Sequence, residues 1–140
     1  MKILVFLLLF QLTFCQDFKY TGKIIGQDLL PLPAIVIANE NDDIIAQTDF
    51  EGHFEIVCPV KLSTLRLSNI GYQSEQFELK INCFNIEIIL LENWIYDFIS
   101  LKKADKKLKR DRKKIIRSLY NEAYEKKIFK AKDCSLELQY

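Results

Sequence analysis

The chain has few of the side chains on which catalysis usually depends. His53 is the only histidine among 140 residues. A Ser-His-Asp or Cys-His arrangement would therefore have to use it. Nothing near His53 in the sequence supports such an arrangement. We therefore predict no catalytic residues and no enzymatic activity.

Sequence patterns that bind metals are missing too. Zinc sites usually combine several His or Cys ligands at close spacing, and neither C-x-x-C nor H-x-x-E occurs. Asp42, Asp43, Asp49 and Glu51 fall in two turns that, if they approach each other, could offer oxygen ligands to calcium. These are also ordinary turn residues, and the D-x-[DN]-x-[DN]-G loop is absent. We predict no metal site and no cofactor.

The N-terminus has the character of a secretory signal. Lys2 precedes an unbroken apolar run from Ile3 to Phe10, which is too short to span a bilayer. We expect residues 1–15 to be a signal peptide, with cleavage before Gln16 and an exported product in the periplasm, at the outer membrane or secreted. A lipid anchor on Cys15 is the weaker alternative, because bulky Phe14 stands where a small residue is usual.

Export makes a disulfide permissible. Cys58 and Cys83 each follow an alternating apolar pattern and share its inward parity. Both are expected at the same end of the fold, so we predict that they are bonded to each other. Two buried free thiols are the alternative, since free cysteine is often buried.

Charge divides the chain in two. From Asp17 to Asp97 there are 13 acidic and 5 basic residues, and from Phe98 to Tyr140 there are 14 basic and 6 acidic ones. An acidic body with a basic tail indicates either mutual attraction or an anionic partner for the tail.

The two parts also differ in periodicity. Alternating apolar residues and turn-forming Gly, Pro, Asn and Asp predict an antiparallel sandwich of two sheets within residues 16–92. The seven expected strands lie near residues 18–26, 34–39, 44–48, 53–58, 63–69, 73–80 and 85–91.

A helical period follows, and we predict one long helix over residues 93–132. Residues 133–140 then form a tail or an edge strand. The apolar seam of the helix consists of Trp94, Phe98, Leu101, Leu108, Ile115 and Leu119, with Asp105 and Arg112 interrupting it. The basic stripe on the opposite face consists of Lys103, Lys106, Lys107, Arg110, Lys113, Lys114 and Arg117.

Three interpretations of this helix stay open. The seam could pack on the chain's own sandwich, leaving lysines in solvent. It could pair with another chain, because its four-three spacing suits a coiled coil. The basic stripe could instead bind an anionic envelope surface, an interpretation that we rank below the other two. Nucleic acid is not expected as a partner, since export removes the protein from cytoplasmic DNA and RNA.

Several short motifs resemble the carboxypeptidase-like regulatory domain, a transthyretin-like β-sandwich found in the cell envelope of Bacteroidetes. They are G-K-I at 22–24, P-L-P-A at 31–34, T-D-F-E-G-H-F at 48–54 and I-G-Y at 70–72. The likeness covers about residues 18–91. The chain departs from the family pattern at Ala34, where glycine is usual, and at residues 39–42, which replace a Gly-Thr turn.

This resemblance implies a non-catalytic module, because the peptidases carry their zinc in a separate domain. It also implies an exposed strand position for His53. We therefore expect an exported envelope scaffold that acts through its C-terminal helix on a protein partner or a second copy. The alternative is a protein that binds an anionic envelope polymer or membrane surface through the basic stripe.

Overall fold

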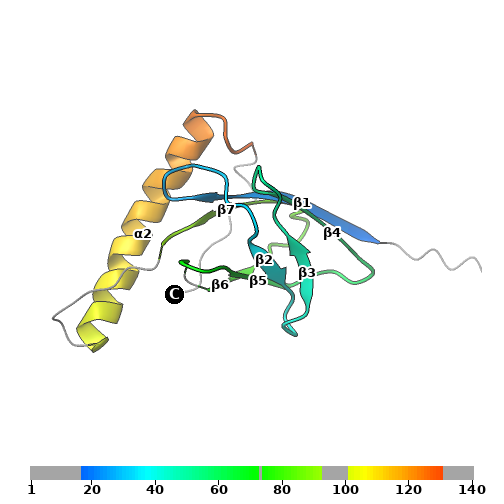
Figure 1. The fold of residues 1–140 in the computed structure, drawn as a ribbon, viewed down its shortest axis with the longest axis horizontal. Helices are drawn as coiled ribbons and strands as arrows, with labels where there is room; N and C mark the ends of the chain where they lie inside the picture. Colours follow the sequence, from blue (N-terminus) through cyan, green and yellow to red (C-terminus); the bar gives the residue numbers. More distant parts are fainter. Residues whose placement is uncertain (1–16, 73, 93–100, 131–140) are drawn as a thin grey trace, which may run out of the picture.

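The computed structural model describes residues 17–72, 74–92 and 101–130. Within these residues, seven strands form two sheets, and one helix lies against them (Figure 1). The first sheet has the order β4-β1-β7 and the second β3-β2-β5-β6. The elements are β1 (Phe18–Gly26), β2 (Val36–Ala38), β3 (Ile44–Gln47), β4 (His53–Cys58), β5 (Thr64–Ser68), β6 (Glu75–Glu78), β7 (Asn85–Leu90) and α2 (Leu101–Glu125).

The expected two-sheet architecture is confirmed, but the fully antiparallel pairing is wrong. β1 and β7 pair in parallel, with Thr21 opposite Asn85 and Gly26 opposite Leu90. β4 pairs with the other side of β1 and is antiparallel to it, so this sheet is mixed.

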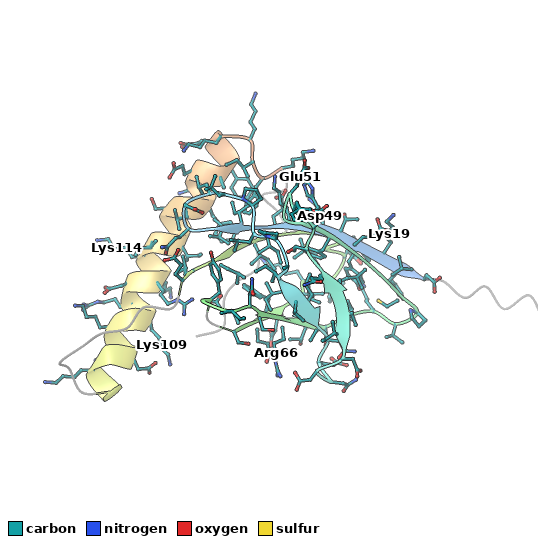
Figure 2. The ribbon with its side chains drawn as sticks, in the orientation of Figure 1. Lys19, Asp49, Glu51, Arg66, Lys109 and Lys114 are labelled. Carbon is teal, nitrogen blue, oxygen red and sulfur yellow. The ribbon has the colours of Figure 1, made fainter. Side chains whose placement is uncertain are left out.

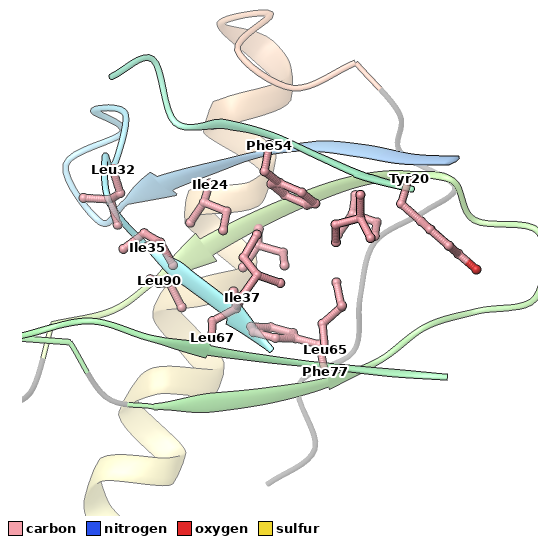
Figure 3. Close-up of a cluster of buried hydrophobic side chains, with 13 residues drawn as sticks. Tyr20, Ile24, Leu32, Ile35, Ile37, Phe54, Leu65, Leu67, Phe77 and Leu90 are labelled. Atoms are coloured by element: carbon pink, nitrogen blue, oxygen red, sulfur yellow. The ribbon is translucent and has the colours of Figure 1, made fainter. Parts of the chain in front are cut away.

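The main core lies between the sheets. Inward positions alternate along β1 and β4, where Tyr20, Ile24, Phe54 and Ile56 are all buried. They meet the inward face of the other sheet, of which Phe77 is the largest fully buried side chain (Figure 3). This is the period of two that the sequence predicts for a half-buried sheet.

A second, smaller core lies on the outer face of the β4-β1-β7 sheet. Ile25 and Ile89 point away from the main core, and Leu91 follows β7. From the helix side they are covered by Ala123 and Phe129. β7 is therefore buried on both faces, which explains its apolar run from Ile88 to Leu90.

The end of α2 turns the chain back onto this second core. Lys127 takes a left-handed conformation with φ 58°. Its amide donates to the carbonyl of Tyr124, and the amide of Ile128 donates to Ala123. This is the Schellman arrangement that closes many helices. It directs Phe129 between the rings of Tyr120 and Tyr124, at centroid distances of 5.7 and 5.9 Å.

The T-D-x-x-G motif has a structural role in the loops that it joins. The Thr48 hydroxyl accepts a hydrogen bond from the Ile35 amide and donates one to the Leu32 carbonyl, which fixes the β1–β2 connection. Asp49 caps the turn by accepting bonds from two amides further along it. At Gly52, with φ 74°, any Cβ would lie 2.4 Å from the Ile24 carbonyl oxygen.

Phe129 tests whether the second core holds the helix in place. We expect Phe129→Ala to lower the free energy of unfolding by about 3–5 kcal/mol, since it empties a buried aromatic site. Phe50→Ala is the matched control, because Phe50 is exposed in a turn and should cost less than about 0.5 kcal/mol. Urea unfolding of both variants measures the difference, and equal losses would contradict this assignment of the helix's buried face.

Candidate functional site

The residues of the predicted seam do not share one environment in the structure. Trp94 and Phe98 lie outside the described residues, and the placement of the side chains of Leu101 and Leu108 is likewise not described. Leu119 packs against the second core, whereas Ile115 is half-buried without joining that cluster. The packed face is rotated from the predicted seam, and its other members are Ile116, Tyr120, Ala123 and Tyr124.

The described helix is also shorter than predicted. It ends at Glu125, and residues 126–130 form the reversing turn and the segment that follows it. Residues 93–100, the tail from 133 and the signal segment 1–15 lie outside the described residues. Sequence periodicity did not reveal the stop, because a lysine occupies the left-handed position where glycine is usual.

Tyr120 connects the helix to the edge of β7. Its hydroxyl accepts a hydrogen bond from the Ile89 amide at 3.2 Å and lies 3.3 Å from the Glu87 carbonyl oxygen, to which it donates. The Glu87 carboxylate in turn accepts from the Lys130 amide at 2.8 Å. The phenol thus takes the place of a neighbouring strand along an edge that would otherwise present unpaired backbone groups.

A buried ion pair ties the middle of α2 to the second sheet. Arg112 and Glu75 are 4% and 8% exposed, and the guanidinium Nη2 contacts the carboxylate Oε1. Within the described residues, Glu75 Oε2 has no hydrogen-bond partner. Burial raises the pKa of Glu75 to about 7, and the positive charge of Arg112 opposes that shift. Arg112, one of the two residues that interrupt the predicted seam, is therefore buried and paired, whereas Asp105 is exposed.

The basic stripe lies on the solvent side of α2. All seven of its residues are exposed, and the labelled Lys114 projects away from the sheets in Figure 2. Arg110, Lys113, Lys114 and Arg117 line a shallow groove of about 340 Å³. They recur at intervals of three and four residues, so they extend over only about 10 Å of helix axis.

Few carboxylates balance these charges. Asp111 lies 3.8 Å from Arg110 at the side of the groove. Within the described part of the chain, no ion pair involves Lys113, Lys114 or Arg117. Concentrated, weakly compensated positive charge attracts anions and is sensitive to salt.

The predicted Cys58–Cys83 disulfide is wrong, because Cys58 carries a free thiol. That thiol lies 3.0 Å from the Val60 carbonyl oxygen, and burial raises its pKa. β1 intervenes, with Cys58 opposite Phe18 on one side and the strand that follows Cys83 on the other. Strands that flank a third lie about 10 Å apart, whereas a disulfide requires Cα atoms within about 7 Å.

The parity argument failed because β6 ends early. It stops at Glu78, and the following turn places Asn82 at φ 67°. Ile81 is consequently exposed, although Phe77 on the same predicted face is fully buried. The alternation of inward and outward side chains does not continue through this turn, so it does not predict the direction of Cys83.

His53 and the acidic turns also have structural positions. His53 is an outward residue of β4, near Glu51 and half exposed, as expected. Asp42 pairs with Arg66, while Asp49 caps its own turn. β3 runs between the two acidic turns, so they lie at opposite ends of the sandwich instead of forming one calcium site. Among the described residues, no group of three His, Cys, Asp or Glu side chains could hold a metal ion.

A polar hollow of about 850 Å³, which sequence reasoning did not anticipate, lies on the outer face of β1 and β4. Lys23, His53, Glu55 and Glu87 line it, together with the segment after α2. Its charges are of both signs and its rim is open, so we assign no ligand to it.

No family model matches the chain, and no curated protein matches its sequence. Among the described residues, no helix combines the length and apolar character needed to cross a bilayer. The basic outer face of α2, with the groove lined by its cations, is the candidate site that the geometry provides.

Tyr120→Phe tests the edge contact. It keeps the ring in the second core but removes the hydroxyl, so the Ile89 amide loses its partner. We expect a loss of about 1–3 kcal/mol in unfolding free energy and faster hydrogen exchange at the Ile89 amide. Tyr72→Phe, on a half-buried ring of the other core, is the comparison variant. Unchanged exchange at Ile89 would show that the hydroxyl does not serve the strand edge.

Glu75 provides a pH test. Its pKa is raised in the folded protein, so the folded state holds the proton more tightly than the unfolded chain does. Its contribution to stability is present at low pH and is lost as pH rises from about 4.5 to about 7. We expect the unfolding free energy to fall by on the order of 1–3 kcal/mol more in the parent than in Glu75→Gln between pH 5 and pH 8. Glu78→Gln, exposed on the same strand, should behave as the parent does; an unchanged pH dependence in Glu75→Gln would contradict the assignment.

Proposed function

We propose that the protein is a non-catalytic, exported binding module that holds an acidic partner protein against the basic stripe of α2. One observation carries this proposal. The C-terminal half of α2 uses its apolar face on its own sheet, so the surface that it offers to other molecules is the basic one.

The rigid attachment of α2 favours a binding role for this face. The Arg112–Glu75 pair, the Tyr120 hydroxyl and the Phe129 anchor fix the helix at three points. Positive side chains on a fixed axis lose less entropy on binding than those of a free helix. This arrangement favours charge-driven docking and disfavours a coiled coil through the residues already packed on the sheet.

The motifs quoted above support assigning the sandwich to the carboxypeptidase-like regulatory domains, with the envelope location which that resemblance implies. Two details agree with the assignment. Ala34 stands where the family usually has glycine and takes φ 59°, and Gly71 of I-G-Y takes φ 88°. In this proposal the sandwich is the scaffold and α2 is the part that binds.

A second candidate uses the same surface. The groove lined by Arg110, Lys113, Lys114 and Arg117 could accept the phosphate or sulfate groups of an anionic envelope polymer. An acidic polypeptide presents carboxylates instead, so the two candidates differ in the ligand that competes best.

The test removes charge without touching the packed face. Lys106, Arg110, Lys113 and Arg117 are changed together to Gln, and binding to polyglutamate and to lipopolysaccharide is measured by calorimetry. We expect the parent to bind polyglutamate more tightly, with affinity falling as salt rises, and the Gln variant to lose about tenfold or more.

The matched control exchanges the cations, with Lys106→Arg, Lys113→Arg, Arg110→Lys and Arg117→Lys. It keeps the charge and should bind within about threefold of the parent, because general charge attraction does not require one cation geometry. Preference for lipopolysaccharide would favour the polymer candidate. Equal binding by the Gln variant and the parent would eliminate the stripe as a site.

A further inference from the structure

The end of the sandwich where β1 begins carries a group of exposed apolar side chains. Val57, Val60 and Ile81 are 57%, 65% and 84% exposed. We call them the N-terminal apolar patch. They belong to the end of β4 and to the two loops that follow β4 and β6. Those loops meet, since Lys61 Nζ lies 3.3 Å from Asn82 Oδ1. Apolar side chains that gather at one place on a surface often mark a contact with a protein or a membrane.

The composition of the patch suits the surface of a bilayer. Between the two loops lies a hollow of about 200 Å³, with Leu62, Leu79 and Phe84 in its lining. Lys61 and Lys80 also border this hollow and are exposed. Aliphatic side chains that enter the acyl boundary, with lysines reaching the headgroups, are typical of interfacial binding.

The N-terminal sequence reaches the fold at this same place. Phe18, the first residue of β1, pairs with Cys58 at the end of β4. Two residues separate Phe18 from Cys15, the alternative site of a lipid anchor. Such a connection spans at most about 11 Å when extended. In the form that carries a lipid on Cys15, the bilayer that holds this lipid would therefore lie next to the patch.

The helix lies at the other end of the molecule. It packs over Ile25 and Leu91, which belong to the ends of β1 and β7 that are remote from Phe18 and Asn85. In Figure 2 the labelled Lys19 marks the patch end and Lys114 the helix end. A membrane at the patch would leave the basic stripe directed away from it.

We propose that the N-terminal apolar patch rests in the surface of a lipid bilayer, with Val60 and Ile81 entering the headgroup–acyl boundary, so that α2 projects from the membrane. This orientation does not depend on which partner binds the stripe.

Vesicle flotation of the protein that begins at Gln16 and carries no lipid tests the proposal, because any partitioning then comes from the folded surface. The vesicles contain phosphatidylcholine alone or phosphatidylcholine mixed with phosphatidylglycerol. The double variant Val60→Ser/Ile81→Ser should lower the partition coefficient by about tenfold or more, because two aliphatic side chains no longer leave water. Sizing and thermal melting should match the parent, since both side chains are exposed.

The opposite end of the sandwich supplies the control. Phe50 and Ile70 are 92% and 96% exposed, in the turn before β4 and the loop after β5. Phe50→Ser/Ile70→Ser removes at least as much exposed apolar surface, so it should leave partitioning within about twofold of the parent. The four-residue Gln variant of the stripe should also leave it within about twofold, which separates this proposal from the function proposed for α2.

Three results would overturn the proposal. One is a parent that does not partition into either vesicle. Another is a control pair or a stripe variant whose partition coefficient falls as far as that of Val60→Ser/Ile81→Ser. The third is a parent dimer that the Val60→Ser/Ile81→Ser variant converts to monomer, because the patch would then be covered by a second copy.

Discussion

The contact between β7 and the end of α2 is the interaction on which the rest of the arrangement depends. β7 is buried on both faces, and a three-stranded sheet cannot cover its own outer side. Ala123 and Phe129 cover it, while the Tyr120 hydroxyl pairs with its edge. Covering both the face and the edge with one helix satisfies the apolar and the polar requirements of the same strand.

This contact decides which face of α2 is available. With Leu119 and Tyr120 turned to the sheet, the stripe from Lys103 to Arg117 is left in solvent. The buried Arg112–Glu75 pair fixes the orientation of α2 more than it stabilises the fold, because desolvation offsets much of the attraction between buried charges. The pair forms at only one rotational position of the helix about its axis. That position determines the direction in which the basic groove faces.

The sequence predicted the features that depend on residues close together in the chain. Alternation located the strands, and β1 and β4 have the bounds that it predicted. The excess of cations predicted an exposed stripe. Long-range partners were not accessible in this way: the parallel β1–β7 pair, the Arg112–Glu75 pair and the strand between Cys58 and Cys83 each join residues distant in the chain. The end of the helix was not predicted, because Lys127 takes a left-handed conformation that glycine usually adopts.

Nuclear Overhauser contacts in the monomer test the central claim most directly. If α2 covers its own sheet, the ring of Phe129 will show cross-peaks to the methyl groups of Ile25 and Ile89 in protein shown to be monomeric by sedimentation. Intermolecular cross-peaks found only in mixed, differentially labelled oligomers, with none in the monomer, would contradict it. The apolar face would then belong to an interface between chains, and the basic stripe would no longer be the face that α2 leaves free.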